Sequence, residues 1–307
     1  MDNLIVCKNI TKIVGKYRLE GINFELKPGY ILGVIGRNGS GKTSLLRTLM
    51  GSYKLDKNLY EENTSDILIN DVSIKKDIKT YKEQFAFVFC ETPFDKTYTS
   101  LDNGKVYGRY YKTFDMDKYI SLLEKFDVPI KRSISKLSKG QQIKQQLAFA
   151  LSYDAKVYFF DEPTGNLDVE FRDLFYKYIR EIVEDGEKCV IYASHLVEEM
   201  EEFADYILWI EAKEEVGRMK FFGNIDELRN NYRIVEGDEE IFNEIPQEFI
   251  LGGRKRENHS EVLVDFTNKQ KLYEAISKEE NIYCLEKNCR YASLKEIMYY
   301  IEKGSVL

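Results

Sequence analysis

Eight consecutive residues near the start of the chain have the types and spacing of a phosphate-binding loop. Glycines let backbone N–H groups approach phosphate oxygens closely, and the first turn of a following helix adds its own unpaired donors. A lysine at the helix start brings positive charge to the β- and γ-phosphates, and the hydroxyl after it can hold Mg²⁺. The pattern G-x-x-x-x-G-K-[ST], followed by Ser44, therefore predicts a nucleotide site at Gly36-Arg37-Asn38-Gly39-Ser40-Gly41-Lys42-Thr43.

Two carboxylates follow an apolar run further along the chain. Val157 to Phe160 is continuously apolar, as expected of a parallel strand buried on both faces. Ligands of open α/β sheets bind at the carboxyl ends of such strands. We therefore expect Asp161 to hold Mg²⁺ together with Thr43, and Glu162 to polarise the attacking water. The alternative is a pair of acids that only begins a surface loop.

A histidine ends another apolar run of the same kind. Lys188 to Ser194 has the pattern of a strand and leads directly into His195, one of two histidines in the chain. An isolated histidine at a strand end usually has a structural rather than a catalytic role. Here it would share the strand-end position of the two acids, where it could hydrogen-bond the γ-phosphate and position the water.

Alternating strands and helices must position these residues. Tyr30 to Ile35, ahead of the glycine loop, has the pattern of a buried strand. Thr43 to Met50, behind it, has the pattern of a helix that stops at Gly51. The sequence therefore predicts an α/β fold.

A short polar segment precedes a further helical pattern. Its first serine and last glutamine have the S-x-x-Q spacing of a capping box, which satisfies unpaired N–H groups at a helix start. A capped helix start with a glycine in its first turn also presents a positive dipole to an anion. The segment reads Leu137-Ser138-Lys139-Gly140-Gln141.

These motifs and their order resemble those of the ATP-binding cassettes of ABC transporters. Leu137 to Gln141 is similar to the family signature, usually LSGGQ, and precedes the Asp-Glu pair as in that family. Asp168 lies in a segment similar to the D-loop, and His195 stands in the place of the switch histidine. The resemblance covers roughly residues 3–228.

The resemblance implies a P-loop NTPase cassette at residues 1–228. Its parts would be a RecA-like core, an antiparallel β subdomain and an α-helical subdomain at about residues 91–153 that carries the signature. ATP and Mg²⁺ are the implied cofactors, and ATP hydrolysis is the implied reaction. Two cassettes, identical or different, would pair head to tail, so that each ATP site is closed by the other chain's Ser138, Lys139, Gly140 and Gln141.

Three positions depart from the family pattern. The aromatic residue that stacks on adenine is expected near Val14, and Tyr17 is the nearest substitute. Cys90 replaces the Q-loop glutamine and offers no amide to Mg²⁺, although Glu91 beside it could act through water. Lys139 replaces a signature glycine, and a cation at a helix N-terminus is unfavourable by roughly 0.3–1 kcal/mol unless it faces phosphate. Because both candidate catalytic residues are present, we still expect hydrolysis.

A narrower resemblance is to single-cassette subunits of bacterial exporters in the bacitracin- and peptide-antibiotic-resistance group. It is carried by Phe24 to Gly33, by Ser293 to Met298, and by Cys90-Glu91, which that group usually has as Asp-Glu. The resemblance implies export of a peptide or similar amphiphile through a separate multi-span membrane permease. We expect the permease to contact the stretch Cys90 to Tyr111.

Composition limits the partners. The chain of 307 residues has 45 basic and 52 acidic residues, and its net charge of −7 argues against binding nucleic acid through bulk charge. No stretch approaches the roughly 18 apolar residues of a spanning helix. The resemblance to transporter cassettes then implies a peripheral protein on the cytoplasmic face of the cell membrane. The alternatives are a soluble ABC ATPase without a transport role and a nucleotide-gated regulatory scaffold with little turnover.

After residue 228 the pattern changes to short alternating elements. We expect an accessory α+β domain at residues 229–307 with the βαββαβ order of a ferredoxin-like fold, dispensable for the chemistry. The expected strands are 232–235, 249–254, 261–266 and 282–285, and the expected helices are 238–244, 269–277 and 294–302.

Overall fold

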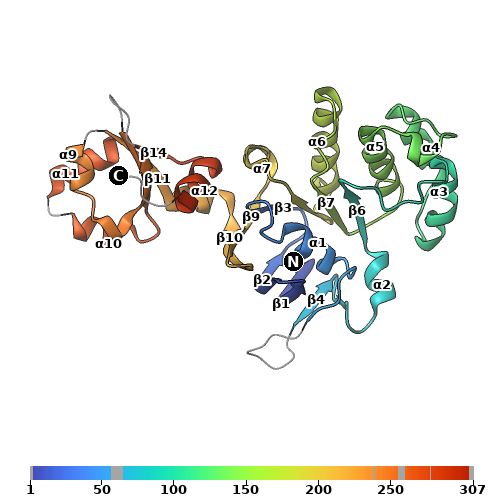
Figure 1. The fold of residues 1–307 in the computed structure, drawn as a ribbon, viewed down its shortest axis with the longest axis horizontal. Coiled ribbons are helices and arrows are strands. Elements are labelled where there is room, and N and C mark those ends of the chain that lie inside the picture. Colours follow the sequence, from blue (N-terminus) through green and yellow to red (C-terminus); the bar gives the residue numbers. More distant parts are fainter. Residues whose placement is uncertain (1–2, 57–64, 238, 255–259, 277, 304–307) are drawn as a thin grey trace. The chain divides into compact units, whose positions relative to one another are not determined.

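The computed structural model of the chain divides into two compact units (Figure 1). The larger unit contains Met1–His195 and Phe203–Phe222, and the smaller contains Leu196–Glu202 and Gly223–Leu307. The expected boundary at residue 228 falls inside helix α8 (Ile225–Asn231), and the segment after His195 groups with the C-terminal unit. The structure describes residues 3–56, 65–237, 239–254, 260–276 and 278–303.

Within its described residues, the larger unit is built on one ten-stranded sheet with the order β5-β4-β1-β2-β10-β9-β3-β8-β7-β6. Strands β1, β2, β4 and β5 pair antiparallel, whereas β9, β3, β8, β7 and β6 pair parallel. The antiparallel β subdomain and the RecA-like core that we expected therefore share one sheet. Its strands are β1 (Ile5–Val14), β2 (Tyr17–Leu26), β3 (Ile31–Ile35), β4 (Asp66–Ile69), β5 (Val72–Ser73), β6 (Phe85–Phe89), β7 (Val157–Asp161), β8 (Cys189–Ala193), β9 (Tyr206–Lys213) and β10 (Val216–Asn224).

The three strands that carry the predicted site are buried along their whole length. Every residue of β3, β7 and β8 is buried, which explains why these segments are continuous apolar runs in the sequence. They are also neighbours in the order β3-β8-β7 and run parallel. The segments that leave their carboxyl ends therefore start at one edge of the sheet.

Three helices of the larger unit form the region expected to be an α-helical subdomain. Helices α3, α4 and α5 lie beside one another in Figure 1, and α5 contacts β6. Their core is aromatic: the ring of Phe149 lies 4.9 Å from that of Phe94 and 4.8 Å from that of Phe114. The helices of this unit are α1 (Lys42–Leu49), α2 (Ile78–Glu83), α3 (Ser100–Tyr107), α4 (Met116–Lys125), α5 (Lys139–Ala150) and α6 (Val169–Val183), with 3-10 turns at Gly108–Tyr110 and Ile134–Lys136.

The C-terminal unit contains a four-stranded antiparallel sheet with the order β12-β13-β11-β14. Its elements follow the βαββαβ order that we expected, with one additional helix before the last strand. They are β11 (Tyr232–Gly237), α9 (Glu239–Asn243), β12 (Ile250–Arg254), β13 (Ser260–Asp265), α10 (Lys269–Ala275), α11 (Glu279–Lys287), β14 (Cys289–Tyr291) and α12 (Leu294–Lys303), with α7 (Val197–Phe203), α8 and a 3-10 turn at Gln247–Phe249.

The prediction of a strand at residues 282–285 is wrong, because this segment is part of α11. Leu285 is buried, Ile282 packs against the same cluster, and Tyr283 between them is exposed. A spacing of three residues places Ile282 and Leu285 on one helical face, whereas a strand would have buried Tyr283 together with Leu285. The edge strand β14 follows the helix instead.

Candidate nucleotide site

The predicted phosphate loop connects β3 to α1 and needs glycine at two positions. The φ angle is +81° at Gly39 and +99° at Gly41, a region that L side chains rarely adopt. At the helix start, Lys42 Nζ donates hydrogen bonds to the carbonyl oxygens of Gly36 at 2.8 Å and Arg37 at 3.2 Å. Burial lowers the pKa of Lys42, while Glu162 and Asp161 oppose this shift. The ammonium group therefore lies over the loop, where phosphate would bind.

The predicted metal ligands lie together. Thr43 Oγ1 donates a hydrogen bond to Asp161 Oδ1 at 3.2 Å, although 118 residues separate them in sequence. Burial raises the pKa of Asp161, and the hydrogen bond from Thr43 only partly offsets this effect. Hydroxyl and carboxylate oxygens are the ligands that Mg²⁺ prefers, and its charge would offset the cost of burying the ionised carboxylate. Thr43 and Asp161 therefore fit a Mg²⁺ site.

The predicted catalytic pair is assembled beside them. Glu162 Oε2 lies 3.1 Å from His195 Nδ1. Parallel pairing of β7 with β8 sets Asp161 opposite Ala193, and the Glu162 N–H donates to the Ala193 carbonyl at 2.9 Å. The φ angle of Glu162 is +49°, and a left-handed conformation costs an L residue about 1 kcal/mol. The sheet thus holds a strained residue with its carboxylate against the imidazole.

Two cavities border the loop, and both include Thr43 and Glu162 in their walls. The smaller has a volume of about 270 Å³ and is lined by Val14, Tyr17, Asn38, Gly39, Gly41, Lys42, Thr43, Ser44 and Glu162. The larger has a volume of about 590 Å³ and is lined by Thr43, Arg47, Ser52, Tyr53, Phe89, Cys90, Glu91, Thr92, Pro93, Asp161 and Glu162.

The two residues considered for base stacking have different surroundings. Tyr17 donates a hydrogen bond from its hydroxyl to the carbonyl of Ser40, and burial raises the pKa of Tyr17 to about 12. Its ring is therefore held by the phosphate loop itself. Val14 is exposed at the end of β1 and offers only a small apolar surface to a base.

Cys90 and Glu91, which the resemblance placed at the Q-loop, both line the larger cavity. The Cys90 N–H donates to the Asp161 carbonyl at 3.0 Å, which holds this end of β6 next to the acids. Partial burial and the neighbouring carboxylates raise the pKa of the Cys90 thiol, so it stays protonated at neutral pH. The thiol therefore adds no negative charge to the phosphate site.

The signature residues start α5 as predicted. Ser138 Oγ accepts from the Gln141 N–H at 3.1 Å and Gln141 Oε1 accepts from the Ser138 N–H at 3.2 Å, which confirms the capping box. A Cβ added to Gly140 would lie 2.8 Å from the carbonyl oxygen of Asn166, so the signature packs against the segment that leads to Asp168. Lys139 is exposed, and among the described residues the walls of the two cavities include no signature residue.

Asp168 has a clear local role. Its carboxylate accepts from the Phe171 N–H at 2.8 Å, which caps α6, and lies 3.3 Å from Lys144 Nζ of α5. The hydrogen bond from Phe171 lowers the pKa of Asp168, so it stays ionised at neutral pH. The D-loop residue thus joins the signature helix to α6 in the same chain.

Two residues of this region were missed by the sequence reasoning. Arg47 lines the larger cavity and could have been found, because it stands four residues after Thr43 and so on the same helical face. Gln146 of α5 exchanges two hydrogen bonds, each 3.0 Å long, with the backbone of Phe89, which immediately precedes Cys90. No local pattern marks Gln146, because its partner lies 57 residues away.

A lysine-bearing glycine loop between a strand and a helix, with an Asp-Glu pair and a histidine at the ends of neighbouring parallel strands, defines a P-loop nucleoside triphosphatase. The family model described as ABC transporter matches residues 19–165. The chain is 30% identical to the protein named "Putative ABC transporter ATP-binding protein AlbC" of Bacillus subtilis, over 72% of this chain and 92% of AlbC. The chain belongs to the ABC transporter ATP-binding family and is an ATPase of that family.

Two further similarities extend this result. The chain is 31% identical to the xylose import ATP-binding protein XylG of Photobacterium profundum, over 71% of this chain but only 44% of XylG. A solved structure of the ATP-binding cassette MJ0796, described as a dimer in a post-hydrolysis state bound to ADP and Pi, superposes with a TM-score of 0.61. It is 19% identical and covers 72% of this chain and 98% of its own, so it shows the shared fold.

Proposed function

We propose that this chain hydrolyses ATP to drive a separate multi-span membrane permease, in the export of a peptide or similar amphiphile. The observation that carries the proposal is the assembled hydrolytic centre, with Glu162 and His195 in contact next to Thr43 and Asp161. Among the described residues, none of the helices has the length and apolar character needed to span a bilayer. The proposed location is the cytoplasmic face of the membrane.

In the proposed mechanism, the loop N–H groups and Lys42 bind the phosphates of ATP. Thr43 and Asp161 would hold Mg²⁺, which supplies positive charge to the β- and γ-phosphates. Glu162 orients the attacking water and accepts its proton, and His195 holds the carboxylate in place through the 3.1 Å contact. The reaction thus depends on positioning and charge, as in other phosphoryl transfers.

We further propose that a second cassette completes each site. The signature residues line neither described cavity of their own chain, so they are free to serve a different one. The capped N-terminus of α5 offers N–H groups and a positive dipole to the phosphates of the partner's ATP. Lys139 would then face an anionic phosphate group, which offsets its unfavourable interaction with the dipole of its own helix.

An aromatic pocket supports the proposed permease contact. It has a volume of about 320 Å³, and four of its nine lining residues belong to the stretch that we expected to receive the permease. Apolar rings on its wall and two lysines on α2 suit a short permease helix with apolar side chains and an acidic end. The residues are Lys79, Lys82, Glu83, Phe87, Phe94, Tyr107, Tyr110, Tyr111 and Phe149.

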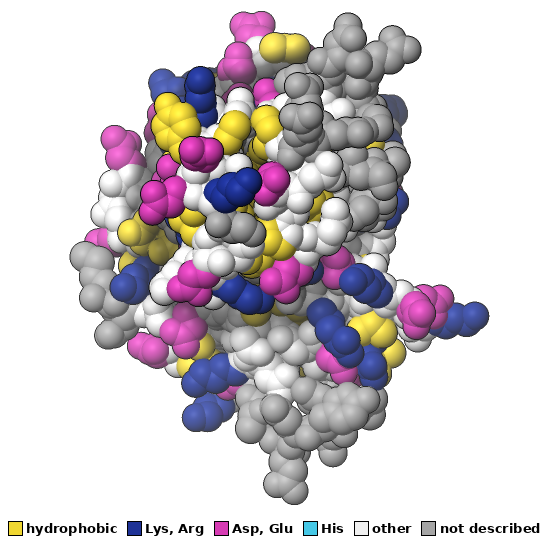
Figure 2. All heavy atoms as spheres, turned by 90° about the vertical axis from the view of Figure 1, so that its left-hand side faces the viewer, with side chains coloured by type: hydrophobic (Ala, Val, Ile, Leu, Met, Phe, Trp, Pro, Cys, Tyr) yellow, Lys and Arg dark blue, Asp and Glu magenta, His cyan; other side chains and the backbone are white. Residues whose placement is uncertain are grey.

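The distribution of charged side chains supports our proposal that the chain has no nucleic-acid partner. On the face shown in Figure 2, Lys and Arg side chains are interspersed with Asp and Glu side chains. Nucleic acid binds through clustered cations that neutralise consecutive phosphates.

The proposed direction of transport, export, rests on the resemblance of Phe24 to Gly33 and of Ser293 to Met298 to exporters. The relative XylG is named for import, so the relatives by themselves do not decide the direction.

The scaffold alternative is favoured by one observation. A protonated thiol, Cys90, lies in the larger cavity where the family has a glutamine. A thiol is a poor partner for Mg²⁺ and for water, which would slow turnover. An ATPase assay of the chain with and without its permease separates the two functions, because only the transport subunit is stimulated.

Cross-linking tests the permease contact directly. In a chain whose exposed Cys90 and Cys284 are changed to serine, Tyr110→Cys should cross-link to the multi-span permease. Tyr283→Cys is the matched control, because Tyr283 is 69% exposed and Tyr110 is 70% exposed. Equal cross-linking of both, or full ATPase activity in a protein absent from membranes, would contradict the proposal.

A further inference from the structure

Gln146 is a buried amide in the middle of α5, the helix that begins with the signature. Its side chain is 1% exposed, and burying an amide is costly unless it is hydrogen-bonded. Gln146 Oε1 accepts from the Phe89 N–H at 3.0 Å, and Gln146 Nε2 donates to the Phe89 carbonyl at 3.0 Å. One side chain therefore satisfies both backbone groups of Phe89, the last residue of β6.

These two hydrogen bonds take the place of a neighbouring strand. The sheet order ends at β6, so within the described residues no strand pairs with the side of β6 that faces away from β7. A peptide group at a sheet edge needs an acceptor for its N–H and a donor for its carbonyl, and an amide side chain supplies both. Gln146 therefore closes the sheet edge at the point where β6 ends.

The end of β6 supports the two carboxylates of the site. Phe89 pairs with Asp161, the last residue of β7, and the Cys90 N–H donates to the Asp161 carbonyl at 3.0 Å. On the β8 side, the Glu162 N–H donates to the Ala193 carbonyl at 2.9 Å. The backbone that carries both acids is thus held from two sides. One of these sides is the sheet edge that α5 closes.

Helix α5 is a firm support for that edge. Gln145, the residue before Gln146, is fully buried, and its Nε2 donates to the Tyr119 hydroxyl of α4 at 2.8 Å. The same hydroxyl donates to the Ser100 carbonyl of α3 at 3.0 Å. Consecutive residues of a helix leave it in directions about 100° apart. One glutamine therefore joins α5 to its neighbouring helices and the next joins it to β6.

We propose that Gln146 is a positioning residue for Asp161 and Glu162. Through the backbone of Phe89 and the Cys90 N–H, its amide fixes the carboxyl end of β7, from which both acids reach the wall of the larger cavity. This inference rests on the proposed roles of the two acids in Mg²⁺ binding and hydrolysis. The α-helical subdomain then contributes to the geometry of its own chain's hydrolytic centre.

The test replaces Gln146 by methionine in the full chain, which keeps the length of the side chain and removes the amide. Hydrogen exchange of the Phe89 N–H must rise, because its acceptor is gone. The informative amide is that of Cys90, whose own acceptor on Asp161 is unchanged. Labelling the five cysteines with ¹⁵N makes its exchange rate measurable by NMR spectroscopy. We expect this rate to rise at least about fivefold in Gln146→Met.

Turnover gives the second measurement. Gln146→Met should lower kcat about fivefold, because small displacements of catalytic groups slow the chemical step. KM for ATP should stay within about twofold, since the contacts of Lys42 with the phosphate loop do not involve β6.

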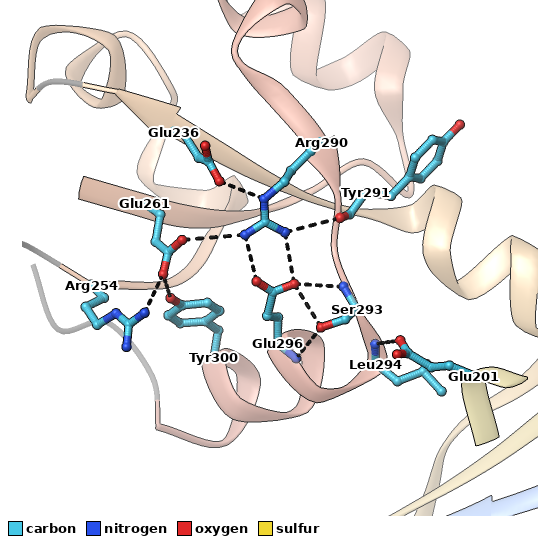
Figure 3. A network of polar contacts seen from close by, with 10 residues as sticks. All are labelled: Glu201, Glu236, Arg254, Glu261, Arg290, Tyr291, Ser293, Leu294, Glu296 and Tyr300. Atoms are coloured by element: carbon cyan, nitrogen blue, oxygen red, sulfur yellow. Dashed lines mark hydrogen bonds and ion pairs between the residues drawn. The ribbon is translucent and has the colours of Figure 1, made fainter. Parts of the chain in front are cut away.

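Gln145→Met is the matched control, because it removes an equally buried amide from the same helix that contacts α4 instead of β6. Tyr300→Phe is a second control in the C-terminal unit, where it removes the buried hydrogen bond from Tyr300 to Glu261 at 2.7 Å (Figure 3). Both variants should lose stability, but neither should change exchange of the Cys90 N–H or kcat.

Should Gln146→Met fail to fold, Gln146→Asn keeps an amide that is one methylene too short for both Phe89 groups, and it should act in the same direction. Unchanged Cys90 exchange in these variants, faster exchange with wild-type kcat, or an equal loss of kcat in Gln145→Met would overturn the inference. Wild-type kcat in Glu162→Gln would instead contradict the proposed function.

Discussion

Replacing Glu162 by glutamine should abolish turnover and preserve ATP binding. The substitution changes one carboxylate oxygen into an NH₂ group, so the side chain keeps its size but can no longer accept a proton. The contacts at the proposed phosphate and metal sites, from Lys42 to the loop and from Thr43 to Asp161, do not involve the side chain of Glu162. We therefore expect the loss to fall on the chemical step alone.

The size of the effect follows from the geometry. Removal of a general base costs about 10²–10⁴-fold in rate, or about 2.7–5.5 kcal/mol of transition-state stabilisation. The fold should tolerate the exchange, because Gln and Glu have the same difficulty with the +49° φ angle of this residue. Stability should therefore stay within about 0.5 kcal/mol of the wild type.

The assay is steady-state ATP turnover together with ATP affinity by titration. We expect kcat to fall at least about a hundredfold, affinity to change less than about threefold, and a dimer with trapped ATP to accumulate in size-exclusion chromatography. Glu181→Gln, in an exposed pair with Lys177 on α6, is the control and should behave as wild type. Turnover of Glu162→Gln within about threefold of the wild type would remove Glu162 from its role.

Three further predictions concern the surrounding residues. Because burial raises the pKa of Asp161, its ionised form destabilises the ligand-free fold as pH rises through that pKa. Asp161→Asn should thus raise Tm by about 2–4 °C at pH 7, by less at pH 4, and abolish Mg²⁺-dependent turnover; equal shifts at both pH values would refute this. Gln146→Ala, which leaves the Phe89 backbone groups unpaired, should lower the free energy of unfolding in urea by about 2 kcal/mol, and a change under about 0.5 would contradict the importance of that contact. Since Val14 is exposed and Tyr17 is held by the loop, ATP and GTP affinities should differ less than about tenfold, or 1.4 kcal/mol, in competition binding.

Sequence reasoning succeeded where the chemistry is local. The capping box of Ser138 and Gln141 depends on residues three apart, and the structure contains both of its hydrogen bonds. The approach of Asp161 to Thr43 could also be predicted, although it is long-range. Continuous apolar runs identify buried parallel strands, and the carboxyl ends of such strands meet at one edge of the sheet.

Sequence reasoning failed where a short apolar segment fits a strand and a helix equally well. Ile282 to Leu285 looks like a strand because it is a short unbroken run of apolar and aromatic residues. The hydrophobic cluster buries Leu285 and leaves Tyr283 exposed. Only the position of this cluster shows that the segment is a helix. That cluster is built by strands and helices distant in sequence, so no local rule contains it.

The same limit explains why the sequence suggested a simple boundary between the two domains. All the motifs of the nucleotide site end at His195, and the next residues carry several glutamates, the usual mark of an exposed helix. Two of those glutamates, Glu198 and Glu201, instead contact residues 97 and 93 positions further on. A helix start attracts carboxylates from any part of the chain, and local patterns cannot say which ones reach it. The C-terminal unit is therefore separate from the cassette in its core and its sheet, but not in the chain segment that leaves the candidate catalytic histidine.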